Sequence, residues 1–106
     1  MTITCYARYV IDAGKIAEFE EYSRMWLDLV PRFGGADHGY FLPSEGESDV
    51  ALAIFSFESL APYDVYRKEA AGNPDVQKAM EFANETKCLL RYERSFFRPL
   101  LTGRNK

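Results

Sequence analysis

Apolar and polar residues alternate over four segments of the chain in the manner of β-strands. β-branched and aromatic residues dominate residues 3–11, and similar residues recur at 37–43, 50–57 and 87–98. A polar, glycine-containing stretch joins the second and third segments, as a hairpin connection would. The pattern therefore predicts four strands, of which the second and third follow each other directly.

Between these strands the apolar residues recur at helical spacing. Residues 15–33 predict one amphipathic helix that ends at Gly34 and Gly35, because glycine accepts the left-handed backbone of a helix end. Two shorter helices follow, with Ser59 and Asn73 as their capping residues. The expected buried residues of the first helix are Ile16, Phe19, Ser23, Trp26, Leu27, Val30 and Phe33. Those of the shorter helices are Tyr63, Tyr66, Ala70, Val76, Ala79, Met80 and Ala83.

The resulting order, β-α-β-β-α-α-β, is that of the split βαβ, or ferredoxin-like, arrangement. Such an α+β domain has one antiparallel sheet with its helices packed on one face. At 106 residues the chain has the size of a single domain. We expect residues 1–101 to form this domain and residues 102–106 to form a frayed tail.

The third predicted strand is apolar on both of its sides. The two sides carry, respectively, Val50, Leu52 and Ile54, and Ala51, Ala53, Phe55 and Phe57. Helices cover only one face of such a sheet, so the other face needs a different cover. The simplest cover is the same sheet of a second subunit, which predicts a homodimer or a higher homo-oligomer. The alternative is a central strand whose flanks are closed by long side chains.

Composition and charge narrow the range of partners. Thirteen basic and sixteen acidic residues are interspersed and give a net charge of −3, which disfavours nucleic acid and anionic membranes. The N-terminal segment lacks a signal-peptide pattern and no apolar run could span a bilayer, so we expect a cytoplasmic protein. One histidine and two distant cysteines, Cys5 and Cys88, predict no metal site, and we expect no cofactor.

Several segments occur together in an order that is typical of one family. They are YARYVI at 6–11, GKIAEF at 14–19, FESLA at 57–61, NPD at 73–75 and ERSFFRPL at 93–100. With these segments the chain resembles the NIPSNAP family, small proteins of the dimeric α/β-barrel class. The resemblance implies the ferredoxin-like fold and a dimer, but no particular reaction. Related dimeric barrels include cofactor-independent oxygenases of aromatic compounds, haem-degrading enzymes and isomerising enzymes, which are analogies of fold.

The candidate ligand-binding residues are Tyr6, Arg8, Trp26, His38, Tyr40 and Tyr66. His38 is the only histidine and therefore the candidate catalytic residue, since imidazole exchanges protons near neutral pH. It shares strand parity with Tyr40, as Tyr6 does with Arg8. An inward-facing cluster of these four would suit a small anionic or phenolic ligand, with the arginine holding a carboxylate.

Each candidate also has a plain structural interpretation. His38 would hydrogen-bond locally near a strand end, Arg8 would pair with Glu93 or a partner subunit, and Trp26 and Tyr66 would pack in the core. Two functions therefore stay open. One is a protein that binds a small aromatic or acidic metabolite between sheet and helices. The alternative is a cofactor-independent monooxygenase- or isomerase-like enzyme.

Overall fold

The computed structural model describes residues 2–100, which form a four-stranded sheet and three α-helices. All strand pairs are antiparallel, and the strands lie in the order β2-β3-β1-β4. Their bounds are β1 (Ile3–Ile11), β2 (Ala36–Phe41), β3 (Val50–Phe57) and β4 (Leu89–Phe97). This is the predicted α+β, ferredoxin-like arrangement. The predicted tail at 102–106 lies outside the described residues.

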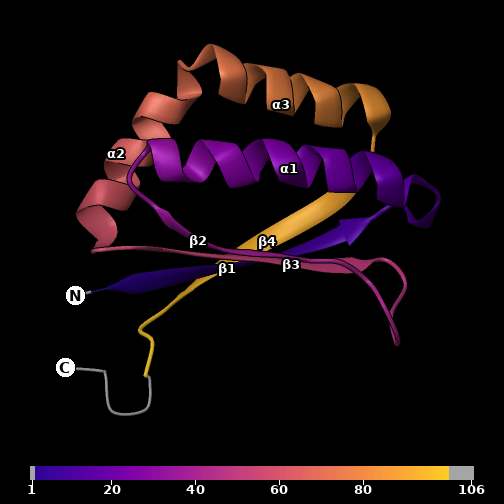
Figure 1. Ribbon diagram of the computed structural model, residues 1–106, viewed down its shortest axis with the longest axis horizontal. Helices are drawn as coiled ribbons and strands as arrows, with labels where there is room; N and C mark the ends of the chain where they lie inside the picture. The colour runs from indigo at the N-terminus through magenta and orange to yellow at the C-terminus, as the bar shows by residue number, and fades with distance from the viewer. Residues whose placement is uncertain (1, 101–106) are drawn as a thin grey trace.

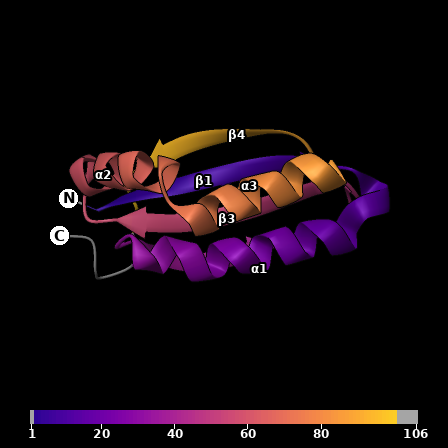
Figure 2. The same cartoon turned by 90° about the horizontal axis from the view of Figure 1, so that it is seen from above.

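The three α-helices lie on one face of the sheet, and no helix of residues 2–100 lies on the opposite face (Figure 1). A short 3₁₀ turn, η1 (Ala13–Lys15), leads into α1 (Ile16–Arg32). The other two helices are α2 (Leu60–Ala71) and α3 (Pro74–Thr86). Seen from above, α1 and α3 run side by side over the strands, and α2 lies at the end where α3 begins (Figure 2). None of these helices is long and apolar enough to cross a membrane.

The core lies between the sheet and the helices. Alternate residues of β1 and β3 face the helices and are buried, namely Cys5, Ala7, Tyr9, Ile11, Ala51, Ala53, Phe55 and Phe57. From the opposite side α1 contributes Phe19 and Tyr22, and α2 contributes Tyr63 and Tyr66. The period-two pattern thus correctly assigns the residues of both central strands to the two faces of the sheet.

Two residues that were expected to be buried are exposed. Leu27 is 40% exposed, because the contact face of α1 is rotated toward Tyr22 and Leu29, which are buried in its place. Met80 is 49% exposed and lies at the rim of a cavity below α3. Helical spacing defines an apolar arc, but packing decides which edge of that arc meets the core.

The helix ends follow the predicted capping residues with one difference. The Asn73 side chain accepts hydrogen bonds from the backbone N–H groups of Asp75 and Val76, at 2.8 and 3.1 Å. Ser59 occupies the corresponding position of α2, but its side chain makes no capping hydrogen bond. After α1 the chain turns at Gly34, whose φ of 91° lies in the left-handed region that glycine tolerates.

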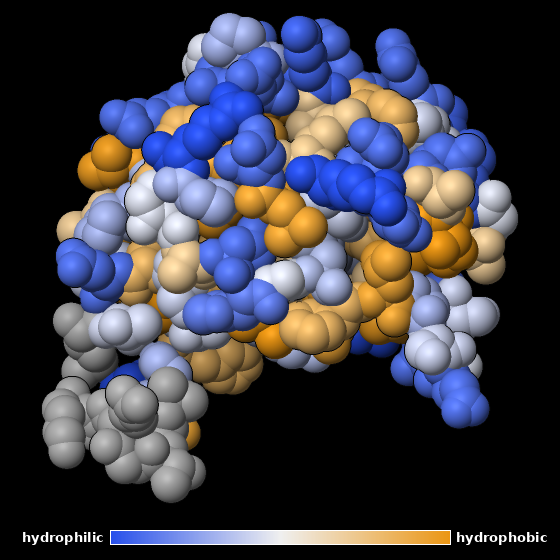
Figure 3. Space-filling model, in the orientation of Figure 1, coloured by the Kyte–Doolittle hydropathy of each residue, from blue (hydrophilic) through white to orange (hydrophobic). Residues whose placement is uncertain are grey.

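The face of the sheet without helices carries an apolar row on β3, as the sequence predicts. Val50, Leu52 and Ile54 of β3 are half-buried there, and Phe97 of β4 is 54% exposed. In Figure 3 the lower margin of the molecule, where the sheet lies, is hollowed and shows several apolar side chains. We call this surface the open face.

Candidate functional site

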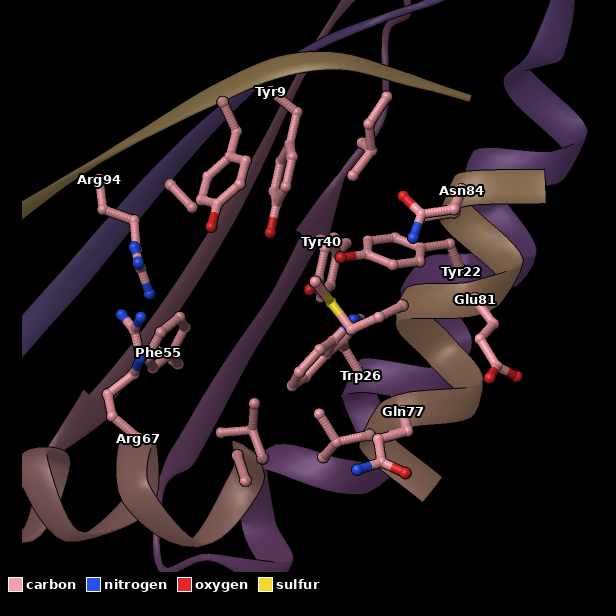
Figure 4. Close-up of a pocket in the computed structure, with 18 of the residues that line it drawn as sticks. Tyr9, Tyr22, Trp26, Tyr40, Phe55, Arg67, Gln77, Glu81, Asn84 and Arg94 are labelled. Carbon is pink, nitrogen blue, oxygen red and sulfur yellow. The ribbon is translucent and has the colours of Figure 1, made fainter. Parts of the chain in front are cut away.

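A cavity of about 720 Å³ lies between the sheet and the helices. Its lining comes from all four strands and all three α-helices of the described chain, so the whole fold contributes to it (Figure 4). Small-molecule sites commonly occupy about 300–1,000 Å³. The cavity is therefore large enough for a metabolite of one or two rings.

Aromatic side chains form much of the cavity wall. They include Tyr9, Tyr22, Trp26, Tyr40, Phe55 and Tyr66. The Tyr9 ring lies nearly parallel to that of Tyr40, with centroids 6.1 Å apart, and edge-on to Phe19, with centroids 5.3 Å apart. Such pairs orient each other's rings, so the wall presents aromatic surfaces in a fixed arrangement.

The buried tyrosines of the wall are neutral. Burial raises the pKa of Tyr9 and of Tyr66 to about 12, because the phenolate form loses its hydration. Burial also raises the pKa of Tyr22 and Tyr40. These hydroxyl groups therefore act as uncharged donors or acceptors at neutral pH and add no negative charge to the cavity.

Two arginines meet at one end of the cavity. Arg67 of α2 and Arg94 of β4 each donate a hydrogen bond from Nη1 to the hydroxyl oxygen of Tyr63, at 3.1 and 2.9 Å. Figure 4 shows the two guanidinium groups directed toward each other. Within residues 2–100, no carboxylate oxygen lies within 4.0 Å of either group. This end, the arginine pair, therefore carries positive charge that no acidic side chain neutralises.

The arginine pair lies where the cavity reaches the surface. A second, more open hollow of about 590 Å³ shares Arg67, Tyr92 and Arg94 with the first. The guanidinium carbon of Arg94 lies 5.5 Å from the centroid of the Tyr92 ring, within cation–π distance. A ligand that approached through this opening would meet the positive charge before the aromatic wall.

One polar atom in the wall has no partner. The indole nitrogen Nε1 of Trp26 is buried and makes no hydrogen bond to any described residue. An unpaired buried donor of this kind costs about 1–3 kcal/mol.

The structure divides the six predicted ligand-binding residues between the two faces of the sheet. Trp26, Tyr40 and Tyr66 line the cavity. Tyr6, Arg8 and His38 lie on the open face. A single inward-facing cluster of Tyr6, Arg8, His38 and Tyr40 therefore does not form within the chain.

The expectation that His38 and Tyr40 share a face is wrong. The register between β2 and β3 shifts between Asp37 and Gly39, which marks a β-bulge. A bulge adds one residue to a strand and thereby breaks the alternation of its side chains. His38 consequently reaches the open face, where its Nε2 lies 2.8 Å from the hydroxyl oxygen of Ser56. Tyr40 lines the cavity on the other side.

The other two residues on the open face make structural contacts. Arg8 lies 3.8 Å from a carboxylate oxygen of Glu47 and 3.9 Å from one of Glu93, so it forms the ion pair that was the structural alternative. Tyr6 packs edge-on against Phe97, with ring centroids 6.1 Å apart. Both residues belong to the open face rather than to the cavity.

The sequence prediction missed both members of the arginine pair. Arg67 lies four residues after Tyr63 on α2, and Arg94 shares strand parity with Tyr92 on β4. Each spacing was a weak local signal. Their convergence depends on how α2 packs beside β4, which neither local pattern reveals.

Comparison with known proteins identifies the family. The NIPSNAP family model matches residues 6–102, which is most of the chain. The chain belongs to the NIPSNAP family. A comparison with curated proteins gives no match.

Solved structures share the fold of this NIPSNAP protein at low sequence identity. A NIPSNAP family protein from Agrobacterium tumefaciens is 18% identical, with a TM-score of 0.83 and full coverage of both chains. A NIPSNAP-like domain protein from Burkholderia xenovorans is 18% identical, with a TM-score of 0.77 over 96% of this chain and 88% of that one. A proposed antibiotic biosynthesis monooxygenase from Nitrosomonas europaea is 10% identical, with a TM-score of 0.72 over 95% and 92%. At such identities the likeness concerns the fold alone.

Proposed function

We propose that this NIPSNAP protein binds a small aromatic or acidic metabolite in the cavity between its sheet and its helices. The observation that carries the proposal is a cavity of about 720 Å³ that joins an aromatic wall to an arginine pair without a carboxylate partner. Binding sites for small molecules commonly combine an apolar wall with a few convergent polar groups.

The aromatic wall supports a ligand that contains a flat ring. Tyr9, Tyr40 and Trp26 offer ring faces and edges, and aromatic pairs contribute about 0.5–1.5 kcal/mol beyond the burial of their surface. A purely aliphatic hydrocarbon would make no such ring contacts.

Two aromatic probes of equal shape test the proposal, namely 2-naphthoate and 2-naphthamide. We expect at least one of them to bind the wild-type protein saturably, with one molecule per chain, in isothermal titration calorimetry. Trp26 is the only tryptophan of the chain and lies in the wall, so its fluorescence should change with the same dissociation constant. At one hundred times that constant the ligand should stabilise the fold by about 2.7 kcal/mol.

A pair of substitutions separates the cavity from other surfaces. Ala83→Phe places a ring into the cavity lining on α3 and should abolish binding. Ala61→Phe makes the same change at an exposed position of α2 outside the lining and should leave binding unchanged. If neither probe binds, or if both variants bind like the wild type, the proposal is wrong.

We further propose that the protein acts as a homodimer through the open face. Val50, Leu52 and Ile54 present an apolar row on that face, and no helix of the described chain covers it. An antiparallel sheet with one solvated face normally carries polar residues there. The open face of a second subunit has the same apolar composition and, with two-fold symmetry, would cover this row.

The enzyme alternative receives less support. It assigns proton transfer to His38 and anion binding to Arg8, and both side chains lie on the open face, across the sheet from the cavity. Turnover in the cavity would depend on the buried tyrosines as proton carriers, and burial raises the pKa of Tyr9 and Tyr66 to about 12. Such weak acids suit hydrogen bonding better than proton exchange near neutral pH.

A further inference from the structure

We propose that the ligand is an aromatic carboxylic acid whose carboxylate lies between Arg67 and Arg94. This inference rests on the proposed function and goes further, since it names the chemical class of the ligand and the residues that select it. Neither arginine belongs to the candidate residues that the sequence suggested. Three features of the structure carry the assignment.

The first feature is the sign of the charge in the cavity. The lining side chains include the two arginines of the pair, Arg67 and Arg94, and one carboxylate, Glu81, which gives a formal charge of plus one, while Arg91 lies opposite Val10 and leaves its strand toward the open face. The whole chain carries a net charge of −3. Figure 4 shows the Glu81 side chain on the far side of the cavity from the arginine pair and directed away from it. An acidic protein thus concentrates positive charge in one cavity, which favours an anionic ligand.

The second feature is the way in which the arginine pair is held. The buried Tyr63 hydroxyl accepts one hydrogen bond from each guanidinium, so it fixes their positions without neutralising their charge. The two guanidinium groups repel each other because both are positively charged, and an anion bound between them would relieve this repulsion. Each guanidinium has five N–H donors and uses one on Tyr63, so several donors stay available for a bound anion.

The third feature is the match between this end of the cavity and a carboxylate. Guanidinium groups bind planar carboxylates through paired, parallel hydrogen bonds. A phosphate ester would present more oxygen atoms and more charge, yet the lining contains no lysine to meet them. The aromatic wall continues inward from the arginine pair, so an acid bound there would place its ring against Tyr9 and Tyr40.

Matched pairs of probes test this assignment by calorimetry. They are 2-naphthoate with 2-naphthamide, and benzoate with benzamide, which differ in charge but hardly in shape. We expect the wild-type protein to bind at least one acid tenfold or more tightly than its amide. In the Arg67→Gln/Arg94→Gln protein this preference should fall below about threefold, while the affinity for the amide stays within about threefold of the wild type. Each single variant should lie between the two.

Lys78→Gln is the control for long-range charge effects. It removes one positive charge from an exposed position of α3 that lies outside the lining, so the preference for the acid should persist. Amide binding by the double variant reports that its cavity is intact. The Trp26 fluorescence change on amide binding gives a second measure of the same point.

The outcomes distinguish this inference from the proposed function. If acid and amide bind the wild type equally, the carboxylate assignment is wrong while the cavity remains a binding site. If the double variant keeps the preference, the acid binds elsewhere and the assignment is wrong as well. If 2-naphthyl phosphate binds more tightly than 2-naphthoate, the arginine pair selects a phosphate, and the carboxylate assignment is wrong. If no probe binds, both proposals fall.

Discussion

The buried tyrosines of the cavity should make the stability of the protein depend on pH in the alkaline range. Burial raises the pKa of Tyr9 and Tyr66 to about 12, against about 10 in an unfolded chain. The folded protein therefore retains protons that the unfolded chain loses as the pH rises above 10. The free energy of unfolding should be unaffected by these groups below about pH 9 and should fall between about pH 10 and 12.

Urea unfolding at increasing alkaline pH measures this loss. Each unit of pKa difference corresponds to about 1.4 kcal/mol, so the neutral Tyr9 alone should account for a loss of about 2 kcal/mol by pH 12. Tyrosinate absorbance should show part of the seven tyrosines ionising only as the circular dichroism of the fold disappears. In Tyr9→Phe the alkaline loss of stability should be smaller. Ionisation of all seven tyrosines near pH 10 with the fold intact would contradict the prediction.

At the scale of single residues the sequence predicts part of the site. Trp26 and Tyr66 were expected either in the core or in the wall of a cavity, and they line the cavity. Tyr40 also lines it, but the cluster in which it was expected does not form.

His38 was misplaced because of the β-bulge between Asp37 and Gly39. Gly39, whose φ is 113°, was the local signal for that bulge, and simple alternation does not take it into account. Arg67 and Arg94 were missed because their meeting point depends on tertiary packing.

Among the elements, α3 has the closest connection with the cavity. It lies beside α1 and farther from the sheet, and its residues Gln77, Met80 and Asn84 line the space beneath it (Figures 1 and 4). The helix begins at a full cap, formed by Asn73, and ends at Lys87, whose φ of 55° is left-handed. Stability of α3 and closure of the cavity should therefore be linked.

Substitution of the two N-cap residues should have unequal effects. Asn73→Ala removes the acceptor for the N–H groups of Asp75 and Val76, and should lower the free energy of unfolding by about 1 kcal/mol. Ser59→Ala removes no capping hydrogen bond, so its effect should be clearly smaller. Denaturant unfolding of the two variants beside the wild type measures the difference. Asn73→Asp keeps an acceptor oxygen and should retain most of the stability.

If Asn73→Ala and Ser59→Ala lowered the free energy of unfolding equally, the capping hydrogen bonds of Asn73 would not stabilise α3 as predicted. The sequence identified both capping positions, but it gave them the same weight. Ser59 adopts an extended backbone with φ of −165° and ψ of −177°, and its hydroxyl makes no hydrogen bond to the first turn of α2. The residue type indicates which positions can cap a helix, and the backbone conformation determines whether the capping hydrogen bond forms.

For the whole molecule, the two faces of the sheet have separate roles. The covered face holds the cavity, the aromatic wall and the arginine pair. The open face holds the apolar row of β3, the ion pairs of Arg8 and the contact between His38 and Ser56. The sequence predicted that both sides of β3 would be apolar. The proposed dimer and the proposed ligand would each cover one face, the second subunit the open face and the ligand the cavity.

Charge placed in the middle of the open face should separate the proposed dimer into monomers. Leu52 lies near the centre of β3, opposite Arg8 of β1 and Phe41 of β2. In a two-fold dimer Leu52→Lys would bury two added positive charges in place of apolar contacts, each beside Arg8 of its own chain, a large cost. The wild type should sediment at twice its mass of 12.2 kDa at micromolar concentration, and Leu52→Lys at 12.2 kDa.

The control for this prediction is Leu60→Lys. Leu60 is 58% exposed in the first turn of α2, so the same change there leaves the open face intact and should leave a dimer. Circular dichroism of both variants shows whether they fold, and probe binding shows whether the cavity survives when the subunits separate. If the wild-type protein sediments as a folded monomer, the dimer is excluded. If Leu52→Lys stays dimeric, the subunits associate through a surface other than the open face. Because the cavity lies wholly within one chain, loss of the dimer with retention of ligand binding is the expected result.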